Sequence, residues 1–208
     1  MNIEKFITER PYLYHLTSAS NSKLIIEKKK LFSTNELVRM SKDKKQLPIL
    51  RTKRLDHHEV IIDGTSFFLR DQRPISEKAL SKCLTDGWVV GDFLYHLNDR
   101  VFTWPTLDRL WRHFNRYKSE KPVIFRFPTI EVIRLNPQVQ FCRLNSGATR
   151  ANSYLGGKPP ERGSKTFLPA EEFPLPVRDV AEVTFPKFCD VNIPFEYSLT
   201  PDGKYRKV

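Results

Sequence analysis

The stretch Tyr12-Leu13-Tyr14-His15-Leu16-Thr17 places the tightest constraint on the fold of this chain. Its aromatic and aliphatic residues alternate as in a buried strand, and alternate residues of a strand point to the same face. His15 and Thr17 should therefore share one face, and a short helix is expected over about residues 21–29. The simplest interpretation is a strand whose histidine bonds a backbone carbonyl. The alternative is that His15 and Thr17 line a binding site.

Two later segments carry strong local signals. Asp63-Gly64 separates β-rich runs at residues 60–62 and 65–70, which is typical of a two-residue hairpin. After Pro105 and Thr106, apolar residues recur at helical spacing and predict a helix that packs on the core. These residues are Leu107, Leu110, Trp111, Phe114 and Tyr117.

Glu182 follows a long aperiodic segment. Residues 145–178 are rich in Gly, Pro, Ser and charge, and a loop of this length in a compact domain is usually functional or disordered. The loop ends in an apolar strand over residues 179–185 that Glu182 interrupts. Such a carboxylate is exposed on an edge strand, paired with a cation, or functional. We expect one domain over residues 1–189 and a polar C-terminal tail over 190–208.

The positive charge is concentrated in one segment. The chain has 35 Lys and Arg against 24 Asp and Glu, and residues 23–54 contain eleven of the basic and three of the acidic residues. This segment favours a polyanionic partner, nucleic acid first. The alternative is a solvated charged face.

Metal, disulfide and membrane chemistry are not expected. Cys83, Cys142 and Cys189 are far apart in sequence, and no C-x-x-C pair occurs. His57 and His58 are adjacent, so on a strand they point to opposite faces and are poorly placed to bind one ion. No run of about 18 apolar residues is present, so we expect no membrane partner and a cytoplasmic location.

The order of these features resembles that of the DarT-type ADP-ribosyltransferases. Tyr14-His15-Leu16-Thr17, a short helix and Leu31-Phe32-Ser33 resemble the opening of that family, although Lys30 replaces its usual glycine. Val180-Ala181-Glu182-Val183 resembles the segment with its catalytic glutamate, and the loop before it occupies the place of the family's substrate-reading loop. The aromatic-Pro-Met run typical of DarT is missing.

The chain is also similar to an uncharacterised family of small bacterial proteins. Its members share three motifs in this order: Arg70-Asp71-Gln72, Asn98-x-Arg100-Val101-Phe102-x-Trp104 and Asn145-Ser146-Gly147.

The DarT resemblance implies an α+β fold with an ADP-ribosyltransferase-like split β-sheet core and peripheral helices. It implies NAD as co-substrate without a metal, and Glu182 as the anion that stabilises an oxocarbenium-like ribose. Arg51 is the first candidate for the catalytic arginine, with Arg54 and Arg70 as alternatives. The residues expected to bind NAD are His15, Thr17, Ser33, Phe102 and Trp104. Those expected to bind nucleic acid are Lys28, Lys29, Lys30, Lys44, Lys45, Arg54 and Arg150.

The expected function is therefore transfer of ADP-ribose from NAD to DNA or RNA. The protein would be a bacterial toxin or phage-defence effector, and an antitoxin protein would be a partner. Alternatives are a protein acceptor, a non-catalytic basic nucleic-acid-binding module on the same scaffold, and RNA 2′-phosphotransferase-like chemistry. The enzyme hypotheses require His15, Phe102 and Glu182 to meet at one cleft.

Overall fold

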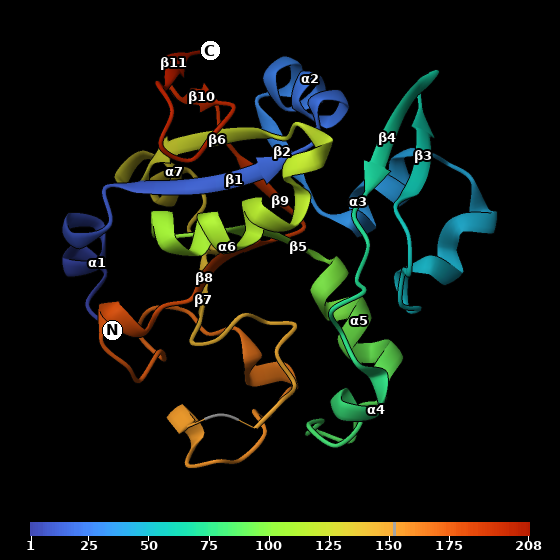
Figure 1. Ribbon diagram of the computed structural model, residues 1–208, viewed down its shortest axis with the longest axis vertical. Helices are drawn as coiled ribbons and strands as arrows, with labels where there is room; N and C mark the ends of the chain where they lie inside the picture. The colour runs from blue at the N-terminus through green and yellow to red at the C-terminus, as the bar shows by residue number, and fades with distance from the viewer. Residues whose placement is uncertain (152) are drawn as a thin grey trace.

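The computed structural model describes residues 1–151 and 153–208, and over these residues the chain has mixed α and β structure with four small antiparallel sheets (Figure 1). The largest sheet has the order β1-β6-β10-β11. Its strands are β1 (Tyr12–Thr17), β6 (Val123–Pro128), β10 (Glu196–Ser198) and β11 (Arg206–Lys207). β1 is the strand predicted from the alternating stretch, and it pairs with β6 along its whole length.

A second sheet places Glu182 at its centre. It has the order β5-β8-β7 and consists of β5 (Arg100–Thr103), β8 (Glu182–Pro186) and β7 (Gln140–Cys142). A bridge between Tyr14 and Trp104 joins it to the first sheet, with N–H to carbonyl distances of 2.9 and 2.8 Å. β1 therefore lies beside β5, and residues from both ends of the chain come close together.

The two remaining sheets are two-stranded. β2 (Lys30–Phe32) pairs with β9 (Phe188–Asp190), and β3 (His58–Ile62) pairs with β4 (Thr65–Leu69). Asp63 and Gly64 connect β3 to β4 with φ values of 48° and 77°, the left-handed conformation that a type I′ turn requires. The predicted hairpin is thus confirmed.

Helices surround these sheets. They are α1 (Ile3–Glu9), α2 (Ala19–Lys28), α3 (Thr34–Met40), α4 (Glu77–Leu80), α5 (Val90–Asn98), α6 (Leu107–Tyr117) and α7 (Thr129–Leu135). Short 3₁₀ segments are η1 (Lys44–Leu50), η2 (Lys118–Glu120), η3 (Ser153–Leu155), η4 (Ser164–Thr166) and η5 (Val177–Asp179). None of these described helices is long and apolar enough to cross a bilayer.

Helix α6 confirms the predicted stripe in part. Leu110, Phe114 and Tyr117 are buried against β1, β6 and Trp104, whereas Leu107 remains 40% exposed. The opposite, polar face of α6 carries arginines that contribute to the cavity described below. The helix therefore closes one core and forms one wall of the cavity.

The prediction of a polar C-terminal tail is wrong. β10 adds to the edge of β6, and Val191 and Phe195 are buried in the main core. Phe195 contacts Phe125 and Phe127 at ring-centroid distances of 5.4 and 5.2 Å. Val191, Ile193, Phe195 and Tyr197 alternate with polar residues and Pro194, a pattern typical of a half-buried strand that the expectation of a tail overlooked.

Candidate active site

A cavity of about 860 Å³ lies where β1, β4, β5, α6 and the start of the 145–178 loop meet. Its size is within the usual range for small-molecule and cofactor sites. All three motifs singled out in the sequence contribute to its wall: Arg70 to Gln72, Asn98 to Trp104, and Asn145 to Gly147. Residues that are far apart in sequence therefore share one space.

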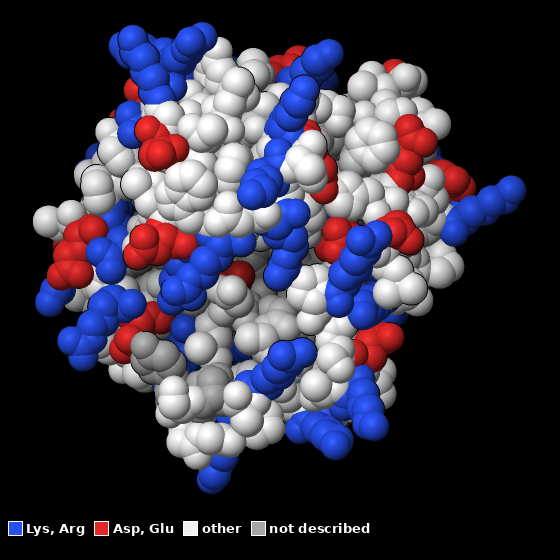
Figure 2. All heavy atoms as spheres, viewed as in Figure 1, with Lys and Arg blue, Asp and Glu red and all other residues white. Residues whose placement is uncertain are grey.

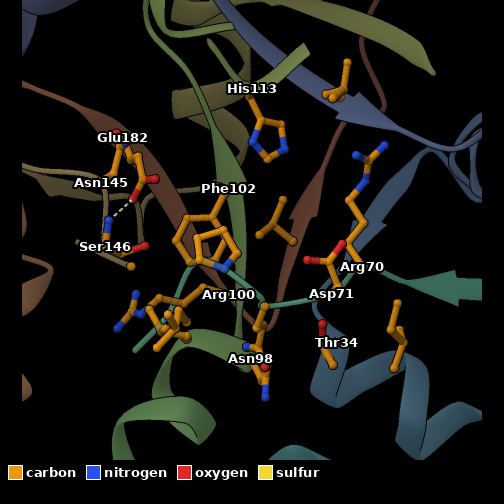
Figure 3. Close-up of a pocket in the computed structure, with 18 of the residues that line it drawn as sticks. Thr34, Arg70, Asp71, Asn98, Arg100, Phe102, His113, Asn145, Ser146 and Glu182 are labelled. Carbon is orange, nitrogen blue, oxygen red and sulfur yellow. Dashed lines mark hydrogen bonds between the residues drawn. The ribbon is translucent and has the colours of Figure 1, made fainter. Parts of the chain in front are cut away.

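His15, Phe102 and Glu182 all line this cavity, as the sequence predicts, together with Thr17 and Trp104. Figure 3 shows Glu182 and Arg70 on opposite sides of the cavity, with Phe102 between them. The described part of the chain has no group of three or more metal-binding side chains suited to an ion.

Glu182 is buried, with 7% of its surface exposed, at the start of the central strand β8. One carboxylate oxygen accepts a hydrogen bond from the backbone N–H of Ser146 at 2.9 Å (Figure 3). Burial raises the pKa of Glu182 above its ordinary value, while Ser146 and the nearby Arg162 and Arg109 oppose that rise. Exposure on an edge strand, the alternative considered from sequence, is wrong.

Arg162 holds the loop that faces Glu182. Its guanidinium is buried and donates to the carbonyl of Asn145 at 3.0 Å and to that of Ala148 at 2.8 and 3.0 Å. These bonds fix the turn that presents the Ser146 N–H to the carboxylate. Sequence reasoning missed Arg162, because it lies in an aperiodic loop where no local pattern marks a buried arginine.

His15 is held in one tautomer. Its Nδ1 lies 2.9 Å from the carbonyl oxygen of Phe102, which only accepts, so Nδ1 carries the proton and Nε2 is an acceptor. Burial lowers the pKa of His15 to about 4, and the Phe102 carbonyl opposes this shift. The imidazole is therefore neutral near pH 7 and presents an acceptor to hydroxyl groups.

Residues 11–188 of the chain match the model of a family of unknown function, DUF7002. The chain belongs to the DUF7002 family. No curated protein and no solved structure matches it. The matched region contains β1, α6, β8 and the whole cavity wall, so the cavity lies within the part of the chain that defines family membership.

His113 is a second neutral histidine in the cavity of this DUF7002 chain. Its ring lies 4.3 Å from the ring of Trp104, and burial lowers its pKa to about 3. Trp104 therefore supports His113 from within the core. Sequence reasoning missed His113 because the apolar stripe of α6 was considered without its polar face, where His113 lies between Arg112 and Arg116.

Seven arginines and two carboxylates line the described part of the cavity wall. The arginines are Arg54, Arg70, Arg100, Arg109, Arg112, Arg116 and Arg150, and the carboxylates belong to Asp71 and Glu182. Figure 2 shows Lys and Arg side chains bordering the hollow near the middle of this face. An anionic ligand fits such a wall, because opposite charge offsets the cost of desolvating the arginines.

Two of the residues proposed for the site lie outside it. Arg51 does not line the cavity: it pairs with Asp92 at 2.5 Å beside a smaller hollow of about 430 Å³. The prediction that Arg51 serves the same site as Glu182 is corrected, since η1 directs it toward α5. Ser33 is also absent from the cavity wall, because its hydroxyl caps α3 by accepting from the Glu36 N–H at 3.2 Å.

Of the residues proposed to bind nucleic acid, the two arginines line the cavity and the five lysines lie outside it. Arg54 is buried and donates to Asn98 at 3.0 Å and to the Arg70 carbonyl at 2.9 Å, so it supports the wall and does not reach a nucleic-acid backbone. Arg150 is exposed and lines the cavity. The five lysines do not line it; Lys28 pairs with Glu27 and Lys30 with Asp190, and the others are Lys29, Lys44 and Lys45.

Proposed function

We propose that this DUF7002 chain is an NAD-dependent ADP-ribosyltransferase with Glu182 as its catalytic carboxylate and an ADP-ribosyltransferase-like core. The observation that carries the proposal is the meeting of buried Glu182, Phe102 and neutral His15 in one arginine-lined cavity. Two small sheets joined beside a cavity agree with the split core that this class of fold requires.

In the proposed reaction the bond between ribose C1′ and the nicotinamide nitrogen breaks, and nicotinamide leaves with the bonding electrons. The ribose develops oxocarbenium character, and the anion of Glu182 stabilises that charge in a water-poor site. A nucleophilic atom of the acceptor then bonds C1′ and loses its proton. Because burial disfavours the charged form of Glu182, a cationic sugar beside it removes part of that cost.

The remaining wall residues position the dinucleotide. The Nε2 of His15 accepts a hydrogen bond from a ribose hydroxyl of the adenosine half, because Nδ1 is already committed to the Phe102 carbonyl. Phe102 provides an aromatic face next to the nicotinamide. Arginines of α6, led by Arg109 and Arg112, face the diphosphate, and charge-assisted hydrogen bonds suit them to it.

We further propose that the acceptor is a nucleic acid that approaches over the exposed Arg150. The test is incubation with labelled NAD in the presence of DNA, RNA or a protein mixture, followed by nuclease or protease. Label that survives protease and is lost with nuclease supports this acceptor, and the reverse supports a protein acceptor. The Glu182→Gln variant should transfer no label, whereas Glu161→Gln, at an exposed loop position outside the cavity, should match the wild type.

The seven arginines and two histidines in the described cavity wall favour a second candidate, RNA 2′-phosphotransferase-like chemistry. There the RNA 2′-phosphate bonds ribose C1′ as nicotinamide leaves. A ribose hydroxyl of the bound ADP-ribose then attacks the phosphorus, so the RNA leaves with a free 2′-hydroxyl and the phosphate stays on ADP-ribose. Incubating a 2′-phosphorylated RNA with and without NAD, and following phosphate loss, separates the candidates. No transfer at all, with salt-sensitive binding of nucleic acid, would instead support a non-catalytic binding module.

A further inference from the structure

Arg70 lies half-buried in the cavity wall in an unusual state. It lies directly after β4, and both of its terminal guanidinium nitrogens are shielded from water and make no hydrogen bond of ordinary geometry with the described residues, although the nearby Tyr117 side chain opposes the fall that burial causes in the Arg70 pKa. Its guanidinium carbon is 4.0 Å from the centre of the Tyr117 ring, and its backbone carbonyl accepts from Arg54 at 2.9 Å. A buried cation without its hydrogen bonds is costly, so this arrangement calls for a missing partner.

The charges around Arg70 indicate that the partner is an anion. Burial, together with the charges of Arg70 and Arg116, lowers the pKa of His113 to about 3, so His113 is neutral near pH 7. Glu120 and Asp71 offset part of the charge of Arg70. Both carboxylates also serve other groups: Glu120 lies 3.1 Å from His57, and Asp71 accepts from the Arg73 N–H at 3.1 Å. We call the group of Arg70, His113, Arg116 and Tyr117 the Arg70 subsite.

The position of the Arg70 subsite separates it from the diphosphate of NAD. In Figure 3 Arg70 lies across the cavity from Glu182, beyond Phe102. The diphosphate is attached to the ribose on which Glu182 acts, whereas the adenosine half extends further from Glu182. Arg70 also influences the pKa of His15, the residue that faces the adenosine ribose in the proposed function, so the two are neighbours.

The number of arginines agrees with a further anion. Three of the seven hold neighbouring groups: Arg54 donates to Asn98, Arg100 to Gln140 at 2.6 Å, and Arg109 to Asn145 at 3.4 Å. These partners are neutral amides, so all seven positive charges remain, and they exceed the four negative charges of one diphosphate, Asp71 and Glu182 by three. A phosphate monoester, with about two negative charges and three acceptor oxygens, fits the excess.

We propose that the Arg70 subsite binds a phosphate monoester separate from the diphosphate of the dinucleotide, an inference that rests on the proposed function for the ligand's orientation. Two sources have this chemistry: the 2′-phosphate of NADP, and a terminal phosphate on the nucleic-acid acceptor. In both, the guanidinium of Arg70 turns toward the ligand so that its two terminal nitrogens, which are shielded from water in this structure, donate to phosphate oxygens.

The test compares ligands that differ only by that phosphate. Calorimetric titrations measure the affinity of NAD and NADP, and of one single-stranded oligonucleotide with and without a 5′-phosphate. Loss of two charge-assisted hydrogen bonds corresponds to roughly tenfold or more in affinity. We expect the wild type to prefer at least one phosphorylated ligand by that factor, and the pair showing the preference identifies the source of the phosphate.

Four variants make the result specific to the Arg70 subsite. Arg70→Gln should abolish the preference, and Arg70→Lys should retain part of it. Arg73→Gln, three positions away, exposed and outside the cavity, should keep it fully. Arg116→Gln should weaken the preference, and it keeps the test decisive if Arg70→Gln does not fold.

Three outcomes would overturn the inference. NAD binding without any gain from an added phosphate on either ligand removes the subsite and leaves the proposed function intact. Equal weakening of NAD and NADP by Arg70→Gln assigns Arg70 to the diphosphate instead. Absence of binding by both dinucleotides removes the proposed function together with the subsite.

Discussion

Replacing Glu182 by Gln tests the chemistry most directly. The amide has nearly the same shape, and its oxygen can still accept the hydrogen bond from the Ser146 N–H that the carboxylate accepts at 2.9 Å. The change therefore removes the negative charge and leaves the β8 pairing and the Ser146 turn in place. Any loss of activity then reports the charge and not the geometry.

The expected loss of rate follows from the burial of Glu182. At a buried position electrostatic stabilisation of a developing charge is strong, and removing one such group typically costs about 10²–10³ in rate, or roughly 3–4 kcal/mol. We expect kcat for ADP-ribosyl transfer to fall by that factor. The Kd for NAD should change by less than about threefold, because ground-state NAD carries little of the charge that Glu182 stabilises.

Glu182→Gln should raise the free energy of unfolding although it lowers the rate. The folded-state pKa of Glu182 is raised by burial, so the wild type is most stable below the ordinary pKa of glutamate and loses stability as pH rises through the folded pKa. Each unit of that rise corresponds to about 1.4 kcal/mol. Glu182→Gln should therefore be more stable than the wild type at pH 7 and lose that advantage below about pH 4.

The assay is single-turnover release of labelled nicotinamide, combined with NAD titration and thermal unfolding at both pH values. A variant with wild-type turnover would refute the role of Glu182. A variant that is less stable at pH 7 would refute the argument from its burial.

Three other changes test the cavity and its surroundings. Burial among aromatic rings lowers the pKa of His96 to about 4, so the folded protein loses stability as pH falls below about 6.5, where the unfolded chain takes up the proton first. Replacing His96 by Phe should therefore reduce the loss of Tm between pH 7 and pH 5, and an unchanged dependence of Tm on pH would contradict this. Arg54→Gln should lower the free energy of unfolding by roughly 2–3 kcal/mol in denaturant titrations by breaking its bonds to Asn98 and the Arg70 carbonyl, while Arg73→Gln stays within about 0.5 kcal/mol. Arg150→Glu should weaken single-stranded oligonucleotide binding and reduce its salt slope by about 0.7 or more, whereas Lys44→Glu should not. An effect of Lys44→Glu without one of Arg150→Glu would place the nucleic acid on residues 23–54.

Local chemistry predicted much of the secondary structure. The Asp63-Gly64 hairpin, strand β1 and helix α6 depend on turn residues and periodicities that act within a few positions. The meeting of His15, Phe102 and Glu182 came from a resemblance in the order of short motifs. No spacing in the sequence shows by itself that these residues share a cavity.

Only the tertiary structure separated the arginines and placed the end of the chain. Arg51, Arg54 and Arg70 are indistinguishable in the sequence. In the structure Arg51 pairs with Asp92 outside the cavity, Arg54 is buried and supports Asn98, and Arg70 lines the cavity with its terminal nitrogens unpaired among the described residues.

The sequence by itself determined strand β1, the Asp63-Gly64 hairpin and helix α6, and it marked Glu182 as a carboxylate among apolar neighbours. The tertiary structure decided that Glu182 lies on a central strand and that residues 190–208 cover the main sheet. The physical reason is that hydrogen bonding and periodicity act along the chain, whereas burial and charge pairing arise between segments far apart in it.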